Sequence, residues 1–317
     1  MDKPLLSLCI PTYNRSQYLK KCIDSIICQQ EFLDGKVEII ISDNASVDNT
    51  REVVDAYLKK YDNIFYHRND ENVRDKNFPI VLSEAHGILR RLCNDTLIYL
   101  PGSLAEMCSV AEKYSDYRPY ICWANGNSKP TEKTFTSDFK GYVHDISFWM
   151  TSILCFSIWD TECSGIKDDT DGCELLLWQV RKGLELASSK NSVLVINKKL
   201  NDVQAVEKKN SSYGLYKVFY ENYFKLLEPY FEKGSLSQED KEYLEKDLLF
   251  HFFSDWCVKW EQQDKKLQYS ETENLKELVW NQYRSKPYWN EFLVYYYFKL
   301  LKCKGIMMIK SLFGKYR

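Results

Sequence analysis

The sequence lacks several patterns that would each indicate a particular class of protein. It has 11 cysteines but no Cys-x-x-Cys pair, so we do not expect a zinc site. The four histidines, at positions 67, 86, 144 and 251, show no metal-ligand spacing. The formal net charge is only −2, which gives no overall attraction to nucleic acid. A structural metal and a nucleic-acid partner are therefore not expected.

Long apolar segments are also missing. No uninterrupted apolar span is long enough to cross a bilayer, and the start Met-Asp-Lys-Pro has no signal-peptide core. Several cysteines lie inside apolar runs, as Cys9 does, which is typical of small core residues. These features predict a cytoplasmic protein with reduced thiols.

The first half of the chain alternates short apolar strands with amphipathic helices. Leu5–Ile10 and Val37–Ser42 have the compact apolar composition of buried parallel strands, and Ser16–Gln30 carries its apolar residues on one helical face. This alternation predicts an α/β fold of Rossmann type, with a mostly parallel sheet and helices on both faces. We also predict a helix over Phe78–Leu92 and a fourth strand over Thr96–Leu100.

The second part of the chain has a different pattern. Beyond the polar stretch Asn201–Asn210 the sequence reads as helical, and Ser237 with Asp240 marks one helix start. We therefore predict two regions: residues 1–205 as a nucleotide-binding and catalytic domain, and residues 206–317 as a helical extension. The aromatic helices after Tyr213 could form an interface, which leaves a homo-oligomer open.

Two polar turns follow the first two strands, and parallel strands would bring them to one edge of the sheet. The first turn reads Pro11-Thr12-Tyr13-Asn14-Arg15. It opens a helix, whose free backbone N–H groups favour an anion, and Tyr13 offers a flat face to a base. The second turn places Asp43 where its carboxylate could accept the imide N–H of uracil or thymine. Each turn alone could be an ordinary helix start, but the pair favours a nucleotide site.

These motifs carry a resemblance to a known family. Ser-Leu-Cys-Ile-Pro-Thr-Tyr-Asn-Arg, followed by Glu-Ile-Ile-Ile-Ser-Asp-Asn-Ala-Ser, resembles the opening of glycosyltransferase family 2. Within it, the sequence is most similar to bacterial O-antigen and capsule enzymes such as abequosyltransferases. The resemblance implies a GT-A fold, with Pro11, Tyr13 and Asp43 at the nucleotide base. Asn44 falls where the family often has a second aspartate.

The resemblance also implies an acidic Asp-x-Asp-type motif that holds Mg²⁺ or Mn²⁺ against the donor diphosphate. We expect that motif after the strand predicted at Thr96–Leu100, where the sequence reads Pro101-Gly102-Ser103 and has no carboxylate. Asp95 precedes that strand, at the wrong end for such a motif. The usual metal ligands are thus missing, and no metal site is predicted.

Three explanations of this gap stay open. The enzyme could be metal-independent, with Arg15, Arg74 and Lys76 supplying positive charge to the departing diphosphate. The acidic residues 168, 169 and 171 could restore a metal site. Alternatively, the protein could bind without catalysing.

An inverting transfer needs a general base for the acceptor hydroxyl. The resemblance places it near the start of a helix beside the acceptor cleft, where this sequence has Asp171 and Glu174. Acids also cap helix starts, so both residues could have only that role.

Residues 295–317 combine apolar and aromatic residues with basic ones and contain no acid. The six basic residues are Lys299, Lys302, Lys304, Lys310, Lys315 and Arg317. This composition predicts a helix that lies on an anionic membrane surface, although a terminal helix with a solvated basic face has the same pattern.

The combined hypothesis is an inverting glycosyltransferase, peripheral on the inner face of the cell membrane. It would move a sugar, UDP-linked as the resemblance implies, to a lipid-linked surface-glycan precursor. The alternative is an inactive nucleotide- or glycan-binding partner of another transferase. Nucleotidyl transfer ranks low because residues 11–15 contain no glycine.

Overall fold

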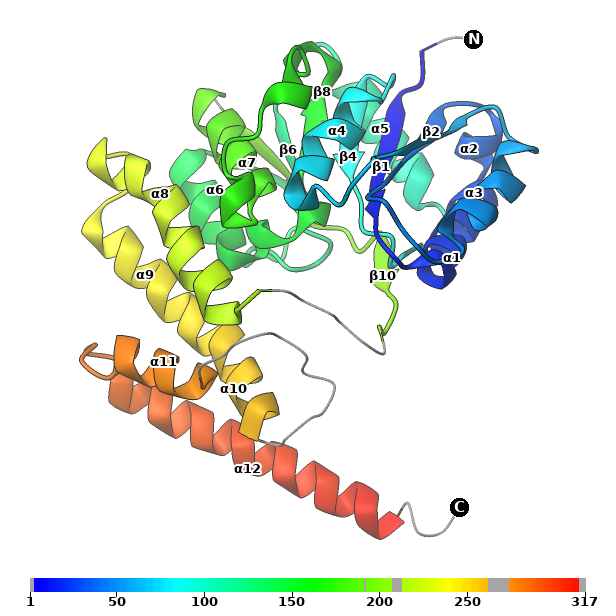
Figure 1. Cartoon of the computed structure of the whole chain (residues 1–317). Helices are drawn as coiled ribbons and strands as arrows, with labels where there is room; N and C mark the ends of the chain where they lie inside the picture. The colour runs from blue at the N-terminus through cyan, green and yellow to red at the C-terminus, as the bar shows by residue number, and fades with distance from the viewer. Residues whose placement is uncertain (1–2, 191, 207–212, 262–273, 314–317) are drawn as a thin grey trace. The chain divides into compact units, whose positions relative to one another are not determined.

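The computed structural model describes residues 3–190, 192–206, 213–261 and 274–313 (Figure 1). The chain divides into two compact units, Met1–Val206 and Glu207–Arg317, and each has its own apolar core.

The first unit is built around a five-stranded sheet in the order β3-β2-β1-β4-β8. β1, β2, β3 and β4 run parallel to one another, and β8 pairs with β4 in the antiparallel direction. The strands are β1 (Leu6–Thr12), β2 (Val37–Asp43), β3 (Ile64–Arg68), β4 (Leu89–Leu92) and β8 (Ser157–Trp159). Every residue of β2 is buried, which fits the run of three isoleucines at its centre.

Two smaller sheets complete this unit. β5 (Leu97–Tyr99) pairs with β10 (Asn201–Val203) in the antiparallel direction. β9 (Val193–Ile196) lies between β6 (Tyr120–Trp123), to which it is parallel, and the antiparallel β7 (Thr134–Ser137).

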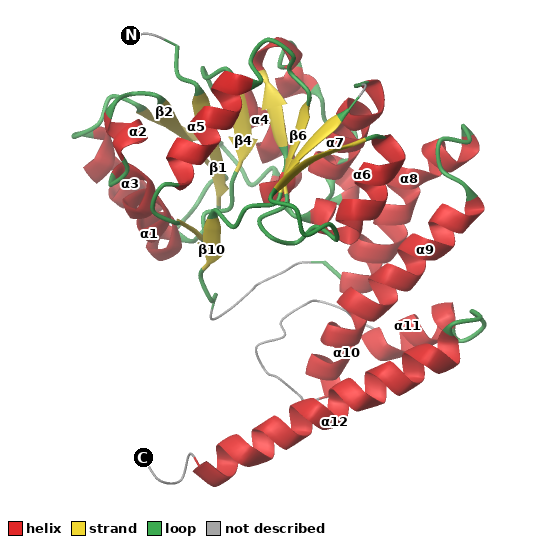
Figure 2. Cartoon of the chain, turned by 180° about the vertical axis from the view of Figure 1, so that it is seen from behind, coloured by secondary structure: helices red, strands yellow, loops and turns green. Residues whose placement is uncertain are grey.

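Helices cover both faces of the main sheet. In Figure 1, α4 lies in front of the strands and α5 behind them, and Figure 2 shows the reverse order from the other side. The helices of this unit are α1 (Ser16–Ile27), α2 (Gln30–Leu33), α3 (Thr50–Leu58), α4 (Asn77–Ser83), α5 (Ser103–Lys113), α6 (Phe139–Ile146) and α7 (Trp178–Ser189). The predicted mostly parallel sheet with helices on both faces is confirmed.

The segment before β4 differs from the prediction. We predicted one helix over Phe78–Leu92, but α4 ends at Ser83 and the chain turns through Gly87 into β4. A side chain at position 87 has no room, because a Cβ would lie 2.5 Å from the Ser7 Oγ atom. Two arginines obscure the strand in the sequence. One of them, Arg91, is nevertheless fully buried, with its guanidinium 4.9 Å from the centre of the Trp123 ring.

The predicted fourth strand also has a different place. It corresponds to β5, which within the described residues forms a two-stranded sheet with β10, separate from the main sheet. The fourth parallel strand is β4, and it ends before Asn94-Asp95-Thr96. Asp95 therefore follows the carboxyl end of a parallel strand, contrary to our expectation.

The second unit is helical. Its elements are a π-helical turn (Lys217–Asn222), α8 (Tyr223–Glu232), α9 (Gln238–Leu248), a second π-helical turn (Leu249–Phe253), α10 (Ser254–Glu261), α11 (Leu275–Tyr283) and α12 (Trp289–Phe313). Ser237 caps α9 as predicted, and its Oγ atom accepts a hydrogen bond from the Asp240 N–H at 3.2 Å. No helix within the described ranges is long and apolar enough to span a bilayer.

Candidate active site

The carboxyl ends of β1, β2, β3 and β4 lie at the same edge of the main sheet because these strands are parallel. Each strand end carries a polar group. Thr12 ends β1, Asp43 ends β2, Arg68 ends β3, and Asp95 follows β4. This edge is where an α/β sheet of this kind binds its ligand.

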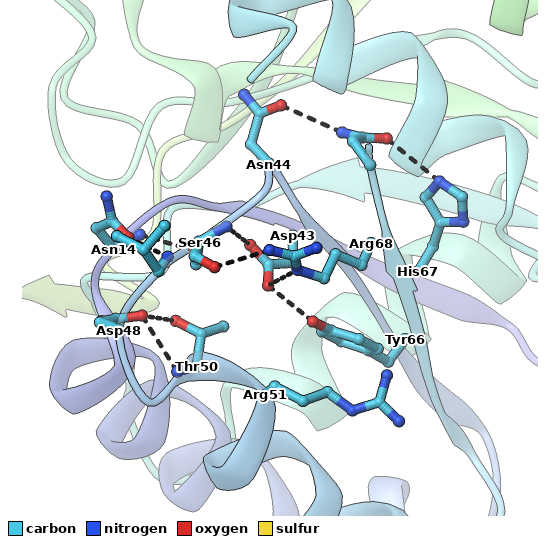
Figure 3. A network of polar contacts seen from close by, with 12 residues as sticks. Asn14, Asp43, Asn44, Ser46, Asp48, Thr50, Arg51, Tyr66, His67 and Arg68 are labelled. Carbon is cyan, nitrogen blue, oxygen red and sulfur yellow. Dashed lines mark hydrogen bonds and ion pairs between the residues drawn. The ribbon is translucent and has the colours of Figure 1, made fainter. Parts of the chain in front are cut away.

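The carboxylate of Asp43 is buried and fully engaged by the protein (Figure 3). Its Oδ1 atom accepts the Ser46 N–H at 2.8 Å, and its Oδ2 atom accepts the Tyr66 hydroxyl at 2.7 Å. The Arg68 guanidinium lies 3.8 Å from Oδ2 and donates to the Ser46 carbonyl at 3.0 Å. Burial, followed by the hydrogen bond to Asp43, raises the pKa of Tyr66. In this arrangement Asp43 holds the turn and the two side chains from β3.

The turns after β1 and β2 are linked to each other (Figure 3). The Asn14 N–H donates to Ser46 Oγ at 2.9 Å, and the Val47 N–H donates to Asn14 Oδ1 at 2.8 Å. Asp48 accepts the Ser16 N–H of α1 at 2.9 Å and the Thr50 N–H of α3 at 3.1 Å. Both helix starts are thus capped from the second turn.

Two of the predicted base-binding residues, Pro11 and Tyr13, lie beside these links. Tyr13 is 43% exposed, so a planar base can stack on its ring. Pro11 is partly buried within β1.

Asn44 connects the second turn to the loop before α4. Its Oδ1 atom accepts the Val73 N–H at 2.9 Å, and its Nδ2 atom donates to Asn72 Oδ1 at 2.8 Å. Asn69 also donates to Asn44 Oδ1, at 3.2 Å. Because these bonds hold residues 72–74, Asn44 determines where the cationic side chain of Arg74 is presented.

Asp95 is held by the first turn. Its Oδ2 atom accepts the Thr12 hydroxyl at 2.8 Å, and its Oδ1 atom accepts an Arg15 N–H at 3.1 Å. The carboxyl is buried, which raises its pKa, while the charge of Arg15 and the bond from Thr12 oppose that rise. Thr12 and Arg15, both predicted to bind nucleotide, therefore also fix the acid at the end of β4. Arg15 remains partly exposed and keeps further N–H groups for a ligand.

The Mg²⁺ or Mn²⁺ implied by the family does not fit this strand end. Asn94-Asp95-Thr96 supplies a single carboxylate, and a guanidinium already neutralises it. Hard divalent cations need several oxygen ligands. The parts of the chain that the structure describes contain no group of three His, Cys, Asp or Glu residues able to hold a metal ion. The acidic residues 168, 169 and 171 do not form such a group, and Asp169 is paired with Arg181 and Lys182.

The remaining predicted residues lie on two 3-10 turns that pack against each other. One turn, Arg74–Lys76, precedes α4, and the other, Cys173–Leu175, precedes α7. Arg74, Lys76, Glu174 and the nearby Asp171 are all exposed. The structure thus brings the predicted diphosphate cations close to the segment with the candidate bases. The backbone carbonyl of Asp171 accepts the Arg181 Nε–H at 3.0 Å, a bond that does not involve the carboxylate.

Some residues of this edge were missed by sequence reasoning. Tyr66 lies in the middle of β3, Arg68 ends it and Asn69 follows, but the sequence alone assigned them no role. The sequence feature that could have indicated a site here is the set of closely spaced asparagines at 69, 72 and 77. All three enter the same hydrogen-bond network. Asp75 was also missed, although it lies between two cationic candidates.

Comparison with known proteins decides the family. A profile described as "Glycosyl transferase family 2" matches residues 7–177, more than half of the chain. The chain belongs to glycosyl transferase family 2. The resemblance inferred from the two N-terminal motifs is confirmed.

Characterised relatives match over shorter segments. The abequosyltransferase RfbV of Salmonella typhimurium is 48% identical over 121 residues, which cover 37% of this chain and 35% of that protein. A Campylobacter jejuni protein, "GalNAc(5)-diNAcBac-PP-undecaprenol beta-1,3-glucosyltransferase", is 35% identical over 112 residues, which cover 35% of each chain. The family 2 chain thus spans about a third of the length of these relatives.

Solved structures show the fold. S. aureus TarS 1-349, solved in complex with UDP-GlcNAc, superposes with a TM-score of 0.57 at 18% identity, over 82% of this chain and 78% of that one. The mannosyltransferase PcManGT of Pyrobaculum calidifontis gives a TM-score of 0.51 at 13% identity, over 94% and 87% of the two chains. The predicted GT-A fold is confirmed.

Proposed function

We propose that this chain is an inverting glycosyltransferase that moves a sugar from a nucleotide sugar to a lipid-linked surface-glycan precursor. The observation that carries the proposal is the polar edge of the main sheet. Hydrogen bonds join the turns after β1 and β2 to each other, and join the second turn to residues 72–74. A nucleotide sugar bound there would meet an aromatic ring, several cations and two carboxylates in succession.

The nucleotide would bind over the first two turns. Tyr13 would stack on the base and Pro11 would border it. Asp43 and Asn44 would hold the backbone of the second turn, on which the nucleotide would lie. Uridine is the proposed base because a fold relative was solved with UDP-GlcNAc. A uracil imide that reaches Asp43 would have to share the carboxylate with Tyr66 and Arg68.

The diphosphate would be neutralised by protein cations. Thr12 and Arg15 both donate to Asp95, and Arg15 stays partly exposed. Arg74 and Lys76 are exposed on the turn that precedes α4. Preorganised cations stabilise the charge that develops on a leaving group. We therefore propose transfer that does not require a divalent metal.

The acceptor would be activated by a carboxylate. In an inverting transfer the acceptor oxygen attacks the anomeric carbon, the bond from that carbon to the diphosphate breaks, and the acceptor proton passes to a base. Glu174 is the preferred base because it is exposed on the turn that packs against Arg74–Lys76. Asp171 is the second candidate.

A lipid-linked acceptor is supported by two observations. The name of the Campylobacter relative includes an undecaprenol-linked diphosphate. In addition, α12 has an exposed apolar stripe in the spacing of one helical face, where Val294, Phe298 and Leu301 are 73%, 71% and 68% exposed. The opposite face is buried against α11, with Tyr296 stacked edge-on to Trp280 at 5.1 Å.

This stripe and the basic residues around it would bind an anionic membrane surface. Lys302 and Lys304 are exposed next to it, whereas Lys299 is paired with Asp255 at 2.7 Å. Residues 314–317, which complete the basic tail, lie outside the described residues. Apolar side chains that enter the interface, combined with lysines, are the features that bind anionic lipids.

A donor screen tests the proposed reaction. Melting temperatures are measured with UDP, GDP, dTDP and CDP sugars, with and without Mn²⁺, and the sugar nucleotide that stabilises most is then used in a transfer assay. We expect a UDP sugar to raise the melting temperature without metal, and transfer to persist in EDTA. Complete loss of activity on chelation, restored by Mn²⁺, would contradict the metal-independent route.

Liposome sedimentation tests the membrane contact. Replacing Phe298 and Leu301 by Gln should abolish binding to vesicles that contain anionic lipid. Leu33→Gln removes a 57% exposed apolar side chain of the other unit and serves as the matched control. If the double variant binds as well as the unchanged chain, the proposed surface is wrong. A loss of self-association instead would assign the stripe to a homo-oligomer.

The alternative function is that of an inactive partner that binds nucleotide or glycan. The specific observation in its favour is the single acid after β4, which is occupied by Arg15. Stabilisation by a sugar nucleotide without transfer or hydrolysis would select this alternative.

A further inference from the structure

The Ser147–Thr151 turn, between α6 and β8, carries an exposed tryptophan. Phe148 and Met150 on either side of Trp149 are buried, whereas Trp149 itself is 42% exposed. The Phe148 ring is stacked on the indole, with the ring centroids 5.4 Å apart and the planes at 29° to each other. The indole is thus supported by a buried neighbour and still presents part of its surface to solvent. Such a surface can accept another ring by stacking.

The pairing of β8 with β4 places this turn at the polar edge of the main sheet. β8 runs antiparallel to β4, so the residues that precede β8 lie beyond the carboxyl end of β4. At that end the Leu92 N–H donates to the Phe156 carbonyl at 3.2 Å, and the thiol of the preceding residue, Cys155, donates to the Trp149 carbonyl at 3.3 Å. The turn therefore lies at the same edge as Asp95. The strand order β1-β4-β8 puts it across β4 from the turn that would hold the base.

The same turn is bonded to the helix that follows the proposed base. The Thr151 carbonyl accepts the side-chain N–H of Gln179 at 2.7 Å, and Gln179 is buried in the first turn of α7. The Cys173–Leu175 turn, which carries Glu174, precedes α7. The start of α7 thus anchors the turn with Trp149 and follows the segment with the carboxylate that would activate the acceptor.

The backbone of this turn is strained and tightly held. Ser147 has φ of 51°, in the left-handed region that residues other than glycine rarely adopt, and its buried hydroxyl has no hydrogen-bond partner in the described structure. The Thr151 hydroxyl donates to the Phe148 carbonyl at 2.7 Å, and the Ser152 N–H donates to the Trp149 carbonyl at 3.0 Å. Strain that the surrounding bonds maintain is typical of segments that hold a side chain for a ligand.

We propose that Trp149 stacks against a sugar ring of the acceptor and thereby holds the hydroxyl that attacks the donor. This inference rests on the proposed function and names the part of the acceptor that the site recognises. One face of a pyranose ring presents C–H groups and is apolar, while its hydroxyls point outward from the rim. A flat indole matches the apolar face, and the partly exposed Thr151 and Ser152 carry hydroxyls next to it in the chain.

The position of Trp149 favours a sugar of the acceptor over the other apolar parts of the substrates. The nucleotide base would stack on Tyr13, on the turn after β1, and β4 lies between that turn and the one with Trp149. The lipid part of the acceptor would bind with the membrane at α12, which belongs to the other unit. The attacking hydroxyl must lie near the base that takes its proton, so the sugar that carries it must lie near Glu174.

Saturation-transfer NMR tests the inference with methyl glycosides of glucose, galactose, mannose and N-acetylglucosamine. The nucleoside diphosphate of the donor that ranks first in the donor screen is present throughout. We expect at least one glycoside to bind the unchanged chain, with saturation concentrated on the ring C–H groups of one face. Trp149→Ala and Trp149→Leu should weaken that binding about 10-fold, whereas Trp149→Phe, which keeps a flat ring, should retain most of it.

The matched control is Tyr117→Ala, which removes an 87% exposed aromatic side chain from the same unit and should behave as the unchanged chain. Affinity for the nucleoside diphosphate should be the same in all four variants, which shows that the nucleotide site is intact.

Four results would overturn the inference. The first is that no glycoside binds the unchanged chain, and the second is that Trp149→Ala binds the glycoside equally well. The third is a weakening of the sugar nucleotide alone in Trp149→Ala, which would assign the indole to the donor sugar. The fourth is an equal weakening of the nucleoside diphosphate, which would assign Trp149 to the architecture of the edge. A chain that binds no sugar nucleotide fails the proposed function, whereas one that binds it but no glycoside fails only this inference.

Discussion

The turn after β2 and the two packed 3-10 turns lie at the same edge of the sheet but treat their polar groups differently. In the turn after β2, Asp43 and Asp48 accept hydrogen bonds from backbone N–H groups and side chains around them. In the 3-10 turns, Glu174 is exposed and Asp75 has a buried oxygen without a partner. The acids of the first region are hydrogen-bonded on both oxygens, whereas one buried oxygen of the second has no partner in the described structure.

We call the turn after β2 the frame, because its polar groups hold the structure together. We call the two 3-10 turns the reacting surface, because they carry the proposed base. Substitutions in the turn after β2 should reduce stability first, because they leave buried donors without acceptors. Substitution of the exposed acids in and beside the 3-10 turns should reduce turnover with little loss of stability. The predictions below test this separation, starting with the largest expected effect.

Glu174→Gln should lower kcat by about 10²- to 10⁴-fold, the usual contribution of a general base, because the amide cannot accept the acceptor proton. The melting temperature and donor affinity should stay unchanged, since the side chain is exposed. Steady-state kinetics of Glu174→Gln and Asp171→Asn measure this. If both variants keep full turnover, the base lies elsewhere and the 3-10 turns are not the reacting surface.

Asp75→Asn should change how stability depends on pH. The folded-state pKa of Asp75 is raised from 3.8 to about 7, so its stabilising protonation is present below pH 4 and is lost as the pH rises through 7. One pKa unit corresponds to 1.4 kcal/mol, which gives an upper bound of about 4 kcal/mol. Urea unfolding from pH 4 to 8 should show a flatter profile for Asp75→Asn. A slope equal to that of the unchanged chain would contradict the burial argument.

Asp43→Asn should lower the free energy of unfolding by about 3 kcal/mol, because an amide presents N–H groups to donors and loses the charge facing Arg68. Tyr66→Phe removes a single bond to that carboxylate and should lower it by about 1 kcal/mol. Urea unfolding at pH 7 measures both. Asp70→Asn, at an exposed acid, is the control. Unchanged stability of Asp43→Asn would mean that the turn is not a frame.

Asn44→Ala tests the connection between the two regions. It removes the acceptor of the Val73 N–H and the donor to Asn72, so the free energy of unfolding should fall by about 2 kcal/mol. Affinity for a nucleoside diphosphate should fall only a few-fold, because Arg74 remains but is less well placed. Fluorescence titration and urea unfolding give the two values. A loss of stability without any loss of affinity would show that the regions are independent.

Much of the fold followed from the sequence because burial leaves a clear pattern. The apolar strands β1 and β2 and the turns after them were predicted correctly, and so was the cap at Ser237. β4 was not predictable by the same reasoning, because Arg90 and Arg91 break its apolar run. The buried guanidinium of Arg91 is satisfied by the Leu154 carbonyl at 3.2 Å, a partner 63 positions away in the chain.

The candidate site was less predictable because its contacts join residues that are far apart in the chain. Identifying Asp95 as a strand-end acid required the correct register of β4, so one misplaced strand placed it at the wrong end. The side-chain partners of Asp43, Tyr66 and Arg68, lie on β3, more than 20 residues further along the chain. A carboxylate with a free oxygen and one with two partners look identical in a sequence.

The links between the first two turns also constrain how this family can change. Asn14 pairs with Ser46 and Val47 across the turns, and Asp48 caps both α1 and α3. An insertion in either turn would pull these atoms out of register and leave helix-start N–H groups without acceptors. Relatives that retain Asn14 and Asp48 should therefore keep both turns at the same length, and a length change in one should be matched by a change in the other.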